Sequence, residues 1–533
     1  MLTGCVSWPE EFARRYRDAG YWRGELLGDL TRNPARPDHP AVCAGGREHS
    51  YADIDTRADR LAAGLYELGI RPGDRVVVQL PNTVEFVQVC LALFRLGAPP
   101  VLALPAHRRH EIAYLCAHTG AVALIVPDLV QGFDFRALAR EVLPTAPTLR
   151  QVLVAGDAEE FVPLSQVDGP ALDLAAPSPS DVAFFLLSGG TTGTPKLIPR
   201  THDDYAFQLR ATAEAVGFDE SGRYLAALPA AHNAALGCPG VLGALRAGGT
   251  AVLAASPSPD EVFPLIAAGA TLTTLTPAYL PLWLDLADLF EIDFTGLTIE
   301  VGGAKLAPEV AARVHRELGA TLTHWFGMAE GMLCFTRPED PVDLPVHTQG
   351  RPMCDADELR VVDQQDQQIT DGSIGELLVR GPCVLRGYYR APEHNARVFT
   401  TDGFLRTGDL VRCTPAGDLV VTGRITDVVN RGGEKVPAEE VEEQLAAHPA
   451  VREAAIVAFP DRMLGEKTCA VVVADGTPPT LAELRAFLGT RGLAEYKLPD
   501  RLRLVDALPR TPIGKVNKAA LRATLDTSQP VKR

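Results

Sequence analysis

The chain has 533 residues, of which 46% are hydrophobic and 22% charged, so it can bury a large core and is not a disordered or fibrous protein. Its net charge of −16 disfavours non-specific binding to nucleic acid or to an anionic membrane surface, so neither partner is expected. The ten cysteines lack the paired short spacing of a disulfide scaffold or zinc site. Reduced thiols and a cytoplasmic location are therefore expected.

From the N-terminus, alternating apolar runs predict a layered α/β domain. A β-branched run at 75–80, an apolar helical pattern at 84–96 and a second strand at 100–104 make a βαβ unit. Two long uncharged stretches, 224–245 and 262–284, contain several prolines, and we interpret them as buried soluble segments rather than membrane spans. Further strands, mostly in parallel sheets, are expected at 121–127, 182–187, 250–254 and 297–302.

The pattern changes near residue 350 and again near residue 425. Short strands separated by glycines predict a β-rich subdomain over roughly 350–425, within an N-terminal core of residues 1–425. Residues 426–533 are predicted to form a small α+β domain. The elements expected in these two regions are strands at 376–380, 419–422, 451–459 and 469–473, a helix from Pro437 to about 448, and a helix opened by a capping box at Thr480 and Glu483.

A loop rich in glycine and hydroxyl groups follows the strand expected at 182–187. It reads Ser188-Gly189-Gly190-Thr191-Thr192-Gly193-Thr194-Pro195-Lys196. Hydroxyls and backbone N–H groups in such a turn can surround phosphate oxygens. The loop forms neither the Walker pattern nor the dinucleotide pattern G-x-G-x-x-G, so it predicts a phosphate site of another class.

The loop is one of several motifs that occur in a fixed order. The others are Phe326-Gly327-Met328-Ala329-Glu330-Gly331, Thr407-Gly408-Asp409, Gly423-Arg424, Arg431-Gly432-Gly433-Glu434-Lys435 and Pro512-Ile513-Gly514-Lys515. In this order, over essentially the whole chain, the sequence resembles the adenylate-forming superfamily of acyl-CoA synthetases, luciferases and nonribosomal-peptide adenylation domains. Ile198-Pro199-Arg200, His232-Asn233 and Gly302-Gly303-Ala304-Lys305 are most similar to its stand-alone aryl-acid adenylating enzymes, the group of 2,3-dihydroxybenzoate-AMP and salicylate-AMP ligases of siderophore and antibiotic pathways.

The resemblance implies an aryl acid ligase that uses ATP and Mg²⁺. Lys515 would bridge the substrate carboxylate and the α-phosphate, because the reaction joins two anions and needs a cation between them. Glu330, assisted by Thr192, would hold Mg²⁺. Asp409 and Arg424 would hold the ribose hydroxyls. The ATP-binding residues implied by the match are Ser188, Gly189, Gly190, Thr191, Thr192, Gly193, Lys196, Gly303, Ala304, Lys305, Phe326, Gly327, Met328, Ala329, Asp409 and Arg424.

The same resemblance places an aromatic carboxylic acid in an acyl pocket. Asn233 would contact an ortho hydroxyl, and His232, assigned a catalytic role with Glu330 and Lys515, would shape the entry of ATP or pantetheine. Cys238 stands where 2,3-dihydroxybenzoate enzymes carry a serine and is a poorer hydrogen-bond partner, so a 3-hydroxyl is less favoured, although a buried cysteine can also be mere filler. The expected pocket residues are Asn233, Ala234, Cys238, Gly302, Gly303, Trp325, Gly327, Leu333 and Lys515.

Departures from the family's pattern leave the acid open. Ala234 stands where the family commonly has a larger residue, and Gly237 is also small. In contrast, Trp325 replaces a smaller residue, and Leu333 narrows the far wall of the pocket. The candidates are salicylate, 2,3-dihydroxybenzoate, 3-hydroxypicolinate, or a bicyclic acid such as 3-hydroxyquinaldate or quinoxaline-2-carboxylate.

For the second half-reaction, the resemblance implies a mobile C-terminal lid that rotates about a hinge at Thr426 and Asp427. The rotation would present Arg431, Gly432, Gly433 and Lys435 to a thiol arm. Nothing after Lys515 resembles the serine motif that carries phosphopantetheine, so a separate aryl carrier protein is expected as the acceptor. An aryl-CoA ligase is the close alternative. A luciferase-like oxygenase is disfavoured because an aryl acid has no α-carbon hydrogen, and a non-catalytic nucleotide-binding protein because Glu330, Asp409 and Lys515 are all retained.

Overall fold

The computed structural model describes residues 2–32, 35–170, 175–188, 195–303, 306, 308–363, 365–424, 428–509, 516 and 518–525. The chain divides into two compact units. The larger is formed mostly by residues before Arg424 and the smaller mostly by residues from Arg424 onward.

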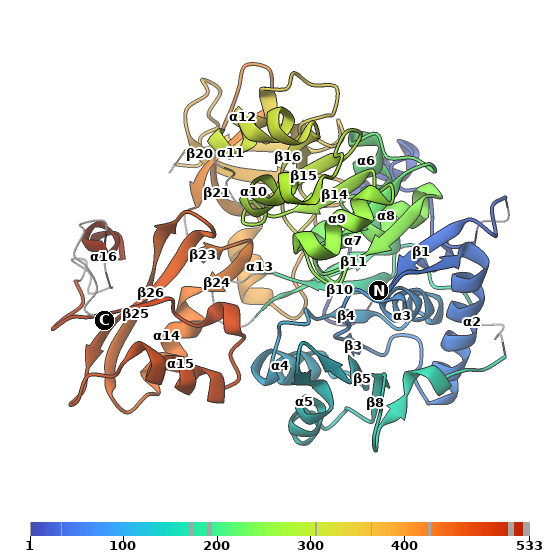
Figure 1. Cartoon of the computed structure of the whole chain (residues 1–533), viewed down its shortest axis with the longest axis horizontal. Helices are drawn as coiled ribbons and strands as arrows, with labels where there is room; N and C mark the ends of the chain where they lie inside the picture. The colour runs from blue at the N-terminus through green and yellow to red at the C-terminus, as the bar shows by residue number, and fades with distance from the viewer. Residues whose placement is uncertain are drawn as a thin grey trace. The chain divides into compact units, whose positions relative to one another are not determined.

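One sheet of the larger unit has the strand order β18-β17-β16-β15-β14-β12-β13-β1-β2 (Figure 1). Its centre is parallel, and β2, β17 and β18 add antiparallel strands at the two ends. The strands are β1 (Pro40–Ala44), β2 (Arg47–Ser50), β12 (Arg223–Ala226), β13 (Thr250–Leu253), β14 (Leu272–Leu275), β15 (Thr298–Gly302), β16 (Thr321–Gly327), β17 (Leu333–Phe335) and β18 (Arg351–Pro352).

A second sheet has the order β11-β10-β4-β3-β5-β8-β9. It is parallel except for the β10–β11 hairpin at one end. The strands are β3 (Val76–Val78), β4 (Pro100–Leu102), β5 (Ala123–Pro127), β8 (Gln151–Ala155), β9 (Val162–Pro163), β10 (Val182–Leu187) and β11 (Leu197–Thr201), with a small hairpin of β6 (Leu129–Val130) and β7 (Phe133–Asp134) beside them.

Helices cover these sheets in layers. A central core contains α2 (Tyr51–Glu67), α3 (Val84–Leu96), α6 (His202–Ala215) and α8 (Gly240–Ala247) with residues of both sheets. The opposite face of the first sheet packs on α9 (Pro259–Ala267), α10 (Leu280–Phe290) and α11 (Pro308–Arg313), and that of the second on α4 (Arg109–Thr119) and α5 (Phe135–Val142). This layering explains why the parallel strands read as nearly continuous apolar runs.

Local signals set several element boundaries. A capping box starts α6, in which the Thr201 side chain accepts from the Asp204 amide and the Asp204 carboxylate accepts from the Thr201 amide. Helix α3 ends at Gly97, which has the left-handed φ of 66° that glycine tolerates. The remaining helical segments of this unit are α1 (Glu10–Asp18), α7 (Asn233–Gly237), α12 (Leu344–His347), α13 (Pro392–Val398), the 3₁₀ turns Leu27–Asp29, Leu143–Thr145 and Leu164–Gln166, and a π-helical turn, Val314–Leu318.

The end of the larger unit is β-rich. A sheet of order β19-β20-β21-β22 is formed by β19 (Glu358–Val362), β20 (Gly375–Arg380), β21 (Leu405–Cys413) and β22 (Leu419–Arg424). The first three strands pair antiparallel.

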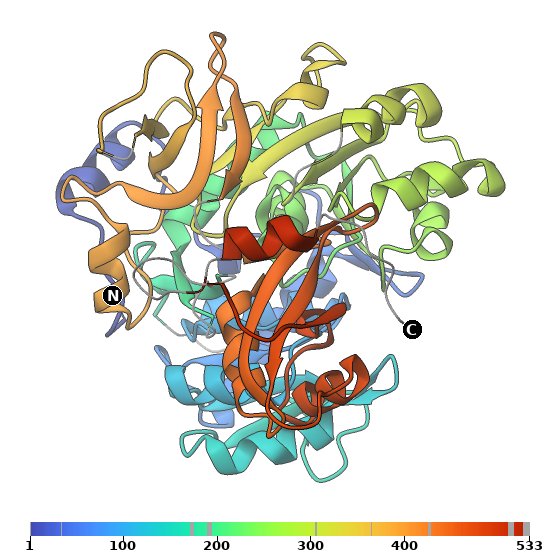
Figure 2. The ribbon, with the colours of Figure 1, turned by 90° about the vertical axis from the view of Figure 1, so that its left-hand side faces the viewer.

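The smaller unit is a sheet with helices on both faces, coloured orange to red in Figure 2. It contains β23 (Val428–Arg431), β24 (Glu434–Pro437), β25 (Val451–Asp461), β26 (Gly465–Ala474), β27 (Arg501–Leu504), α14 (Ala438–Ala446), α15 (Leu481–Thr490), α16 (Lys518–Leu525) and the 3₁₀ turn Glu495–Lys497. Helices α14 and α15 pack on one face, and α16 packs on the other.

The predicted α/β class with a smaller C-terminal α+β domain is confirmed. The strand predicted at 182–187 is β10, and the capping box at Thr480 starts α15. The uncharged stretch 262–284 is not one element, because it contains most of α9, all of β14 and the start of α10. Within the described residues, no helix combines the length and the apolar character that a membrane span requires.

Candidate functional site

The two ends of the predicted phosphate loop lie side by side. Strands β10 and β11 pair antiparallel, with Leu187 opposite Leu197. The Ser188 amide donates to the Lys196 carbonyl at 2.9 Å, and the Lys196 amide donates to the Ser188 hydroxyl oxygen at 3.3 Å. The loop therefore begins and ends at one point of the sheet. Gly189, Gly190, Thr191, Thr192 and Gly193 lie outside the described residues.

A buried arginine connects β11 to the segment that follows β16. The Arg200 guanidinium donates to the Asp204 carboxylate at 2.8 Å and to the Gln208 side-chain oxygen at 2.9 Å. It also donates to the Ala329 carbonyl at 3.0 Å. Arg200 is completely buried, so these bonds position the segment that contains Glu330.

Glu330 lies in this segment with its carboxylate half-buried. The Tyr388 hydroxyl donates to its Oε1 at 2.8 Å. Tyr388 packs edge-on against His394, whose pKa is lowered to about 4 by burial, with a smaller contribution from Lys196. The structure therefore brings Glu330 and Lys196 into one region through Tyr388 and His394.

Other predicted ATP-binding residues follow nearby strands. Phe326 and Gly327 end β16, and Met328 and Ala329 continue the chain, where the Met328 amide donates to the Met332 carbonyl at 3.1 Å. Gly303 follows β15 with a φ of 79°. Asp409 is buried on β21 and its amide donates to the Thr407 hydroxyl oxygen at 3.0 Å. Ala304, Lys305, Lys515 and the side chain of Arg424 are outside the described part of the chain.

The predicted acyl-pocket residues of α7 belong to a buried hydrogen-bond cluster. The Tyr205 hydroxyl donates to Asn233 Oδ1 at 2.9 Å, and the Asn233 Nδ2 group contacts Cys238 Sγ at 3.6 Å. The Gln208 amide donates to the Gly237 carbonyl at 2.8 Å. Burial raises the pKa of the Cys238 thiol above its usual range, so Cys238 is a neutral, weakly polar surface.

Aromatic side chains fill the space beside two glycines of this region. A Cβ at Gly237 would collide with the Tyr205 hydroxyl, and a Cβ at Gly302 would collide with the Trp325 ring. Leu333 similarly packs against Gly327. The glycines therefore do not simply enlarge the pocket, because Tyr205, Trp325 and Leu333 occupy the space that they leave.

His232 and Ala234 flank Asn233 in different environments. The His232 ring nitrogen Nδ1 accepts from the Ala234 amide at 3.3 Å, which makes His232 the N-cap of α7. His232 is exposed, whereas Ala234 is buried. His232 thus has a capping role whether or not it also contacts a substrate.

The residues predicted to meet a thiol arm form a turn in the smaller unit. Gly432 and Gly433 have φ values of 63° and 95° and join β23 to β24, where Lys435 lies. Arg431 makes a bidentate ion pair with Asp500, at 2.8 and 2.9 Å, which raises the pKa of Arg431. The Arg431 side chain is therefore held within its own unit. The predicted hinge residues Thr426 and Asp427 lie outside the described residues.

Sequence reasoning missed the buried groups that surround the predicted site residues. Tyr205 and Gln208 contact Asn233 and were not predicted, although their spacing along α6 places both on one helix face. Glu300 was also missed. A single acidic residue within the apolar strand Thr298–Gly302 is the signal that could have identified it.

Comparison with known proteins connects these residues to a family. The model of the AMP-binding enzyme family matches residues 31–389, and that of the AMP-binding enzyme C-terminal domain matches residues 440–515. The chain is 52% identical over 529 residues to 2,3-dihydroxybenzoate-AMP ligase of Bacillus subtilis, with 98% of each chain covered.

A second relative and a solved structure extend this similarity. The chain is 48% identical to a salicyl-AMP ligase / salicyl-S-ArCP synthetase of Mycobacterium tuberculosis, with 98% of this chain and 94% of the relative covered. The apo structure of Mycobacterium smegmatis MbtA is similar with a TM-score of 0.76 and 48% identity, and 98% of each chain is covered. The chain therefore belongs to the AMP-binding enzyme family, whose members are adenylate-forming, ATP-using ligases.

Proposed function

We propose that this protein activates an aromatic carboxylic acid with ATP and transfers the aroyl group, with release of AMP, to the phosphopantetheine thiol of a separate aryl carrier protein. The observation that carries this proposal is the buried cluster of Asn233, Tyr205, Gln208 and Cys238 in a chain that matches aryl acid ligases over its whole length. The cluster fixes an amide next to a weakly polar thiol, which suits an aromatic ring with one polar substituent.

The first half-reaction needs positioning and positive charge more than acid–base chemistry. An aryl carboxylate is ionised near neutral pH, so its oxygen attacks the α-phosphorus directly and the bond to the departing pyrophosphate breaks. The closed base of the 188–196 loop supports a phosphate-binding role for that loop. Lys515 would supply a cation between the two anions.

Glu330 has the chemistry that a magnesium ion requires. Its carboxylate is a hard oxygen ligand, half-buried and held in place by Tyr388. Mg²⁺ would neutralise charge on the phosphates, and Thr192 would assist in holding it. Asp409 and Arg424 would hold the ribose.

The acyl pocket supports an ortho-hydroxy aryl acid of the salicylate or hydroxy-heteroaryl type. The Asn233 amide would bind the ortho hydroxyl, and Cys238 would lie where a 3-hydroxyl would need a stronger partner. One relative is named as a salicyl-S-ArCP synthetase, which supports carrier loading, whereas two others are named for CoA, which keeps an aryl-CoA ligase as the alternative.

ATP–pyrophosphate exchange tests this function directly, because it reports the first half-reaction without the carrier. We expect exchange with one class of aryl acid among salicylate, 2,3-dihydroxybenzoate, 3-hydroxypicolinate, 3-hydroxyquinaldate and quinoxaline-2-carboxylate. Amino acids and fatty acids should give no exchange. Exchange with a fatty acid alone would contradict the proposal.

Lys515→Ala separates the two half-reactions. It should reduce exchange by about 100-fold or more, and it should leave aroyl transfer from supplied aroyl-AMP to a carrier largely intact. Equal loss of both steps would remove Lys515 from the proposed role.

A further inference from the structure

A row of buried polar side chains crosses one face of the sheet next to the predicted acyl pocket. Thr274 on β14, Glu300 on β15 and Thr323 on β16 are register neighbours, so their side chains share one face. All three are completely buried. Figure 1 shows the three strands side by side in the larger unit. The residues on the opposite face, such as Ile299 and Val301, belong to an apolar core.

The hydrogen bonds along the row have a defined direction. The Tyr224 hydroxyl donates to Thr274 Oγ1 at 3.0 Å, and the Thr274 hydroxyl donates to Glu300 Oε2 at 2.6 Å. Burial raises the pKa of Glu300 to about 8, so its carboxyl group is protonated at neutral pH. Because Oε2 accepts from Thr274, the proton of Glu300 belongs on Oε1 and is available to donate.

Three polar atoms at the end of this row have no hydrogen-bond partner among the described residues. They are Glu300 Oε1, Thr323 Oγ1 and the Trp325 indole Nε1. Each can donate a hydrogen bond, and the indole nitrogen can only donate. A buried polar atom without a partner is destabilising, so the set requires an acceptor from outside the described residues.

The row lies beneath the residues assigned to the acyl pocket. Gly302 and Trp325 are two residues beyond Glu300 and Thr323 on the same strands, and therefore lie on the same face nearer the carboxyl ends. Ligands of parallel α/β sheets bind at those carboxyl ends. Glu300 is close enough to Cys238 for an ionised Glu300 carboxylate to raise the pKa of the Cys238 thiol, which places the row beside the Asn233 cluster.

We infer that Glu300 is a specificity-determining residue, which donates a hydrogen bond to an acceptor atom on the edge of the aromatic ring remote from the reacting carboxylate. Thr323 and Trp325 flank this bond. The inference rests on the proposed function. The acceptor is a ring nitrogen or a phenolic oxygen. An acid that has only C–H groups on this ring edge leaves the Glu300 proton without an acceptor, and its kcat/KM is therefore lower.

Matched acids in ATP–pyrophosphate exchange test this inference. Quinoxaline-2-carboxylate and quinoline-2-carboxylate differ by one ring nitrogen, and 2,3-dihydroxybenzoate and salicylate differ by one hydroxyl. In at least one pair we expect kcat/KM to be about 10-fold higher for the acid with the additional acceptor. The pair that shows the preference identifies the acceptor as nitrogen or oxygen.

Glu300→Leu should reduce that preference to about 3-fold or less, because the donor is lost. Exchange with the acid that lacks the acceptor should persist, which shows that the variant is folded. Glu300→Gln should retain most of the preference, because the neutral amide still donates. If Glu300→Leu does not fold, Thr274→Val provides the test, since it removes the bond that places the Glu300 proton.

Thr273→Val is the matched control. Thr273 is the adjacent buried threonine on the other face of β14, where its hydroxyl donates to the Leu225 carbonyl at 2.9 Å. Thr274→Val should lower the preference and Thr273→Val should not. No preference within either pair in the wild type, or a preference unchanged in Glu300→Leu, would mean that only water fills the row and would overturn the inference. A wild type without exchange for any aryl acid would instead refute the proposed function.

Discussion

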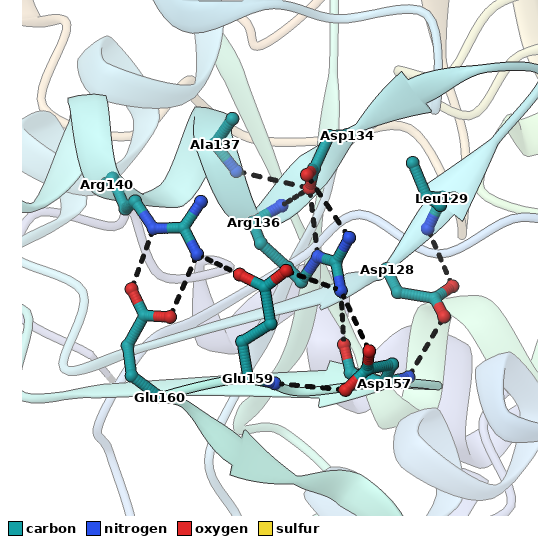
Figure 3. A network of polar contacts seen from close by, with 9 residues as sticks. All are labelled: Asp128, Leu129, Asp134, Arg136, Ala137, Arg140, Asp157, Glu159 and Glu160. Carbon is teal, nitrogen blue, oxygen red and sulfur yellow. Dashed lines mark hydrogen bonds and ion pairs between the residues drawn. The ribbon is translucent and has the colours of Figure 1, made fainter.

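Two polar regions of the larger unit differ in whether their hydrogen bonds are satisfied. Near the surface, the buried Arg136 and the exposed Arg140 of α5 are surrounded by carboxylates (Figure 3). The Arg140 guanidinium donates to Glu160 at 2.7 Å, and Arg136 donates to Asp134 at 3.0 Å. In the interior, the row of Thr274, Glu300 and Thr323 contains no cation, and Glu300 Oε1 and Thr323 Oγ1 have no partner within the described ranges.

The two glutamates show what this difference means. Hydrogen bonds from Arg140 lower the pKa of Glu160 to about 2, whereas burial raises the pKa of Glu300 to about 8. The surface network of Arg136 and Arg140 is paired within itself, and its Arg140 pairs are exposed to water, so it requires no ligand. The interior row is incomplete, so it indicates a ligand. The two regions thus differ in whether every hydrogen bond is met, and not only in charge density.

The largest expected effect is at the ion pair of Arg200 and Asp204, which is buried like Glu300 but has a charged partner as Glu160 does. Arg200→Met should lower the unfolding free energy of the larger unit by about 3–5 kcal/mol, because Asp204 would remain buried without its cation. Urea unfolding monitored by tryptophan fluorescence measures this loss. Arg140→Met on the surface is the matched control, and a comparable loss there would break the distinction between the two regions.

The second prediction concerns the pH dependence of stability. Glu300 has a reference pKa of 4.5 and a folded pKa of about 8, so the folded state binds its proton more tightly. The contribution of Glu300 to the unfolding free energy is fully present below pH 4.5 and is lost as the pH rises to 8. The unfolding free energy then falls with a limiting slope of about 1.4 kcal/mol per pH unit. The pKa values of Tyr224 and Cys238 are raised above their usual ranges, so neither neighbour titrates in this window.

Glu300→Gln should remove this slope, because its amide does not titrate. The measurement is the difference in unfolding free energy between wild type and variant at pH 5, 6.5 and 8. We expect the difference to shift in favour of the variant as the pH rises. Parallel pH curves would show that the Glu300 carboxyl is solvated. The pH dependence that Glu160 gives to stability has the opposite sign, since its stabilising contribution is lost as the pH falls from 4.5 towards 2.

The sequence predicted elements whose signals are local. Strand β10 is a continuous apolar run bounded by turn residues, and α15 begins at a capping box, so both were located correctly. The predicted helix at Pro437 begins at Ala438, since Pro437 is its N-cap. The division of 262–284 into two helices and a strand was not predictable, because an uncharged stretch gives no period that separates them.

The candidate site was predictable only in part, because its contacts join distant segments. Asn233 and Cys238 follow from motif positions, but their bonds to Tyr205 and Gln208 of α6 depend on tertiary packing. Similarly, Glu300 and Thr323 become neighbours only through the register of β15 and β16. No spacing within one segment encodes a partner on another strand.

A smaller effect is expected for Cys238→Ser. A serine hydroxyl is a stronger hydrogen-bond partner than a thiol, so the kcat/KM ratio of 2,3-dihydroxybenzoate to salicylate should rise by about 3- to 10-fold. Pyrophosphate exchange with both acids gives the ratio. Cys90→Ser is the control, because Cys90 is equally buried on α3. An unchanged ratio for Cys238→Ser would exclude Cys238 from the recognition of the acid.

The smallest effect is expected for Glu160→Gln in the surface network. Arg140 also pairs with Glu159, so one carboxylate remains when Glu160 is neutralised. Water and salt screen both pairs, and we expect no change in unfolding free energy beyond experimental error at pH 7, either at low salt or in about 0.5 M NaCl. A clear loss at low salt that disappears in NaCl would show that the surface network is energetically coupled. The contrast with the interior would then rest on the unmet hydrogen bond of Glu300 alone.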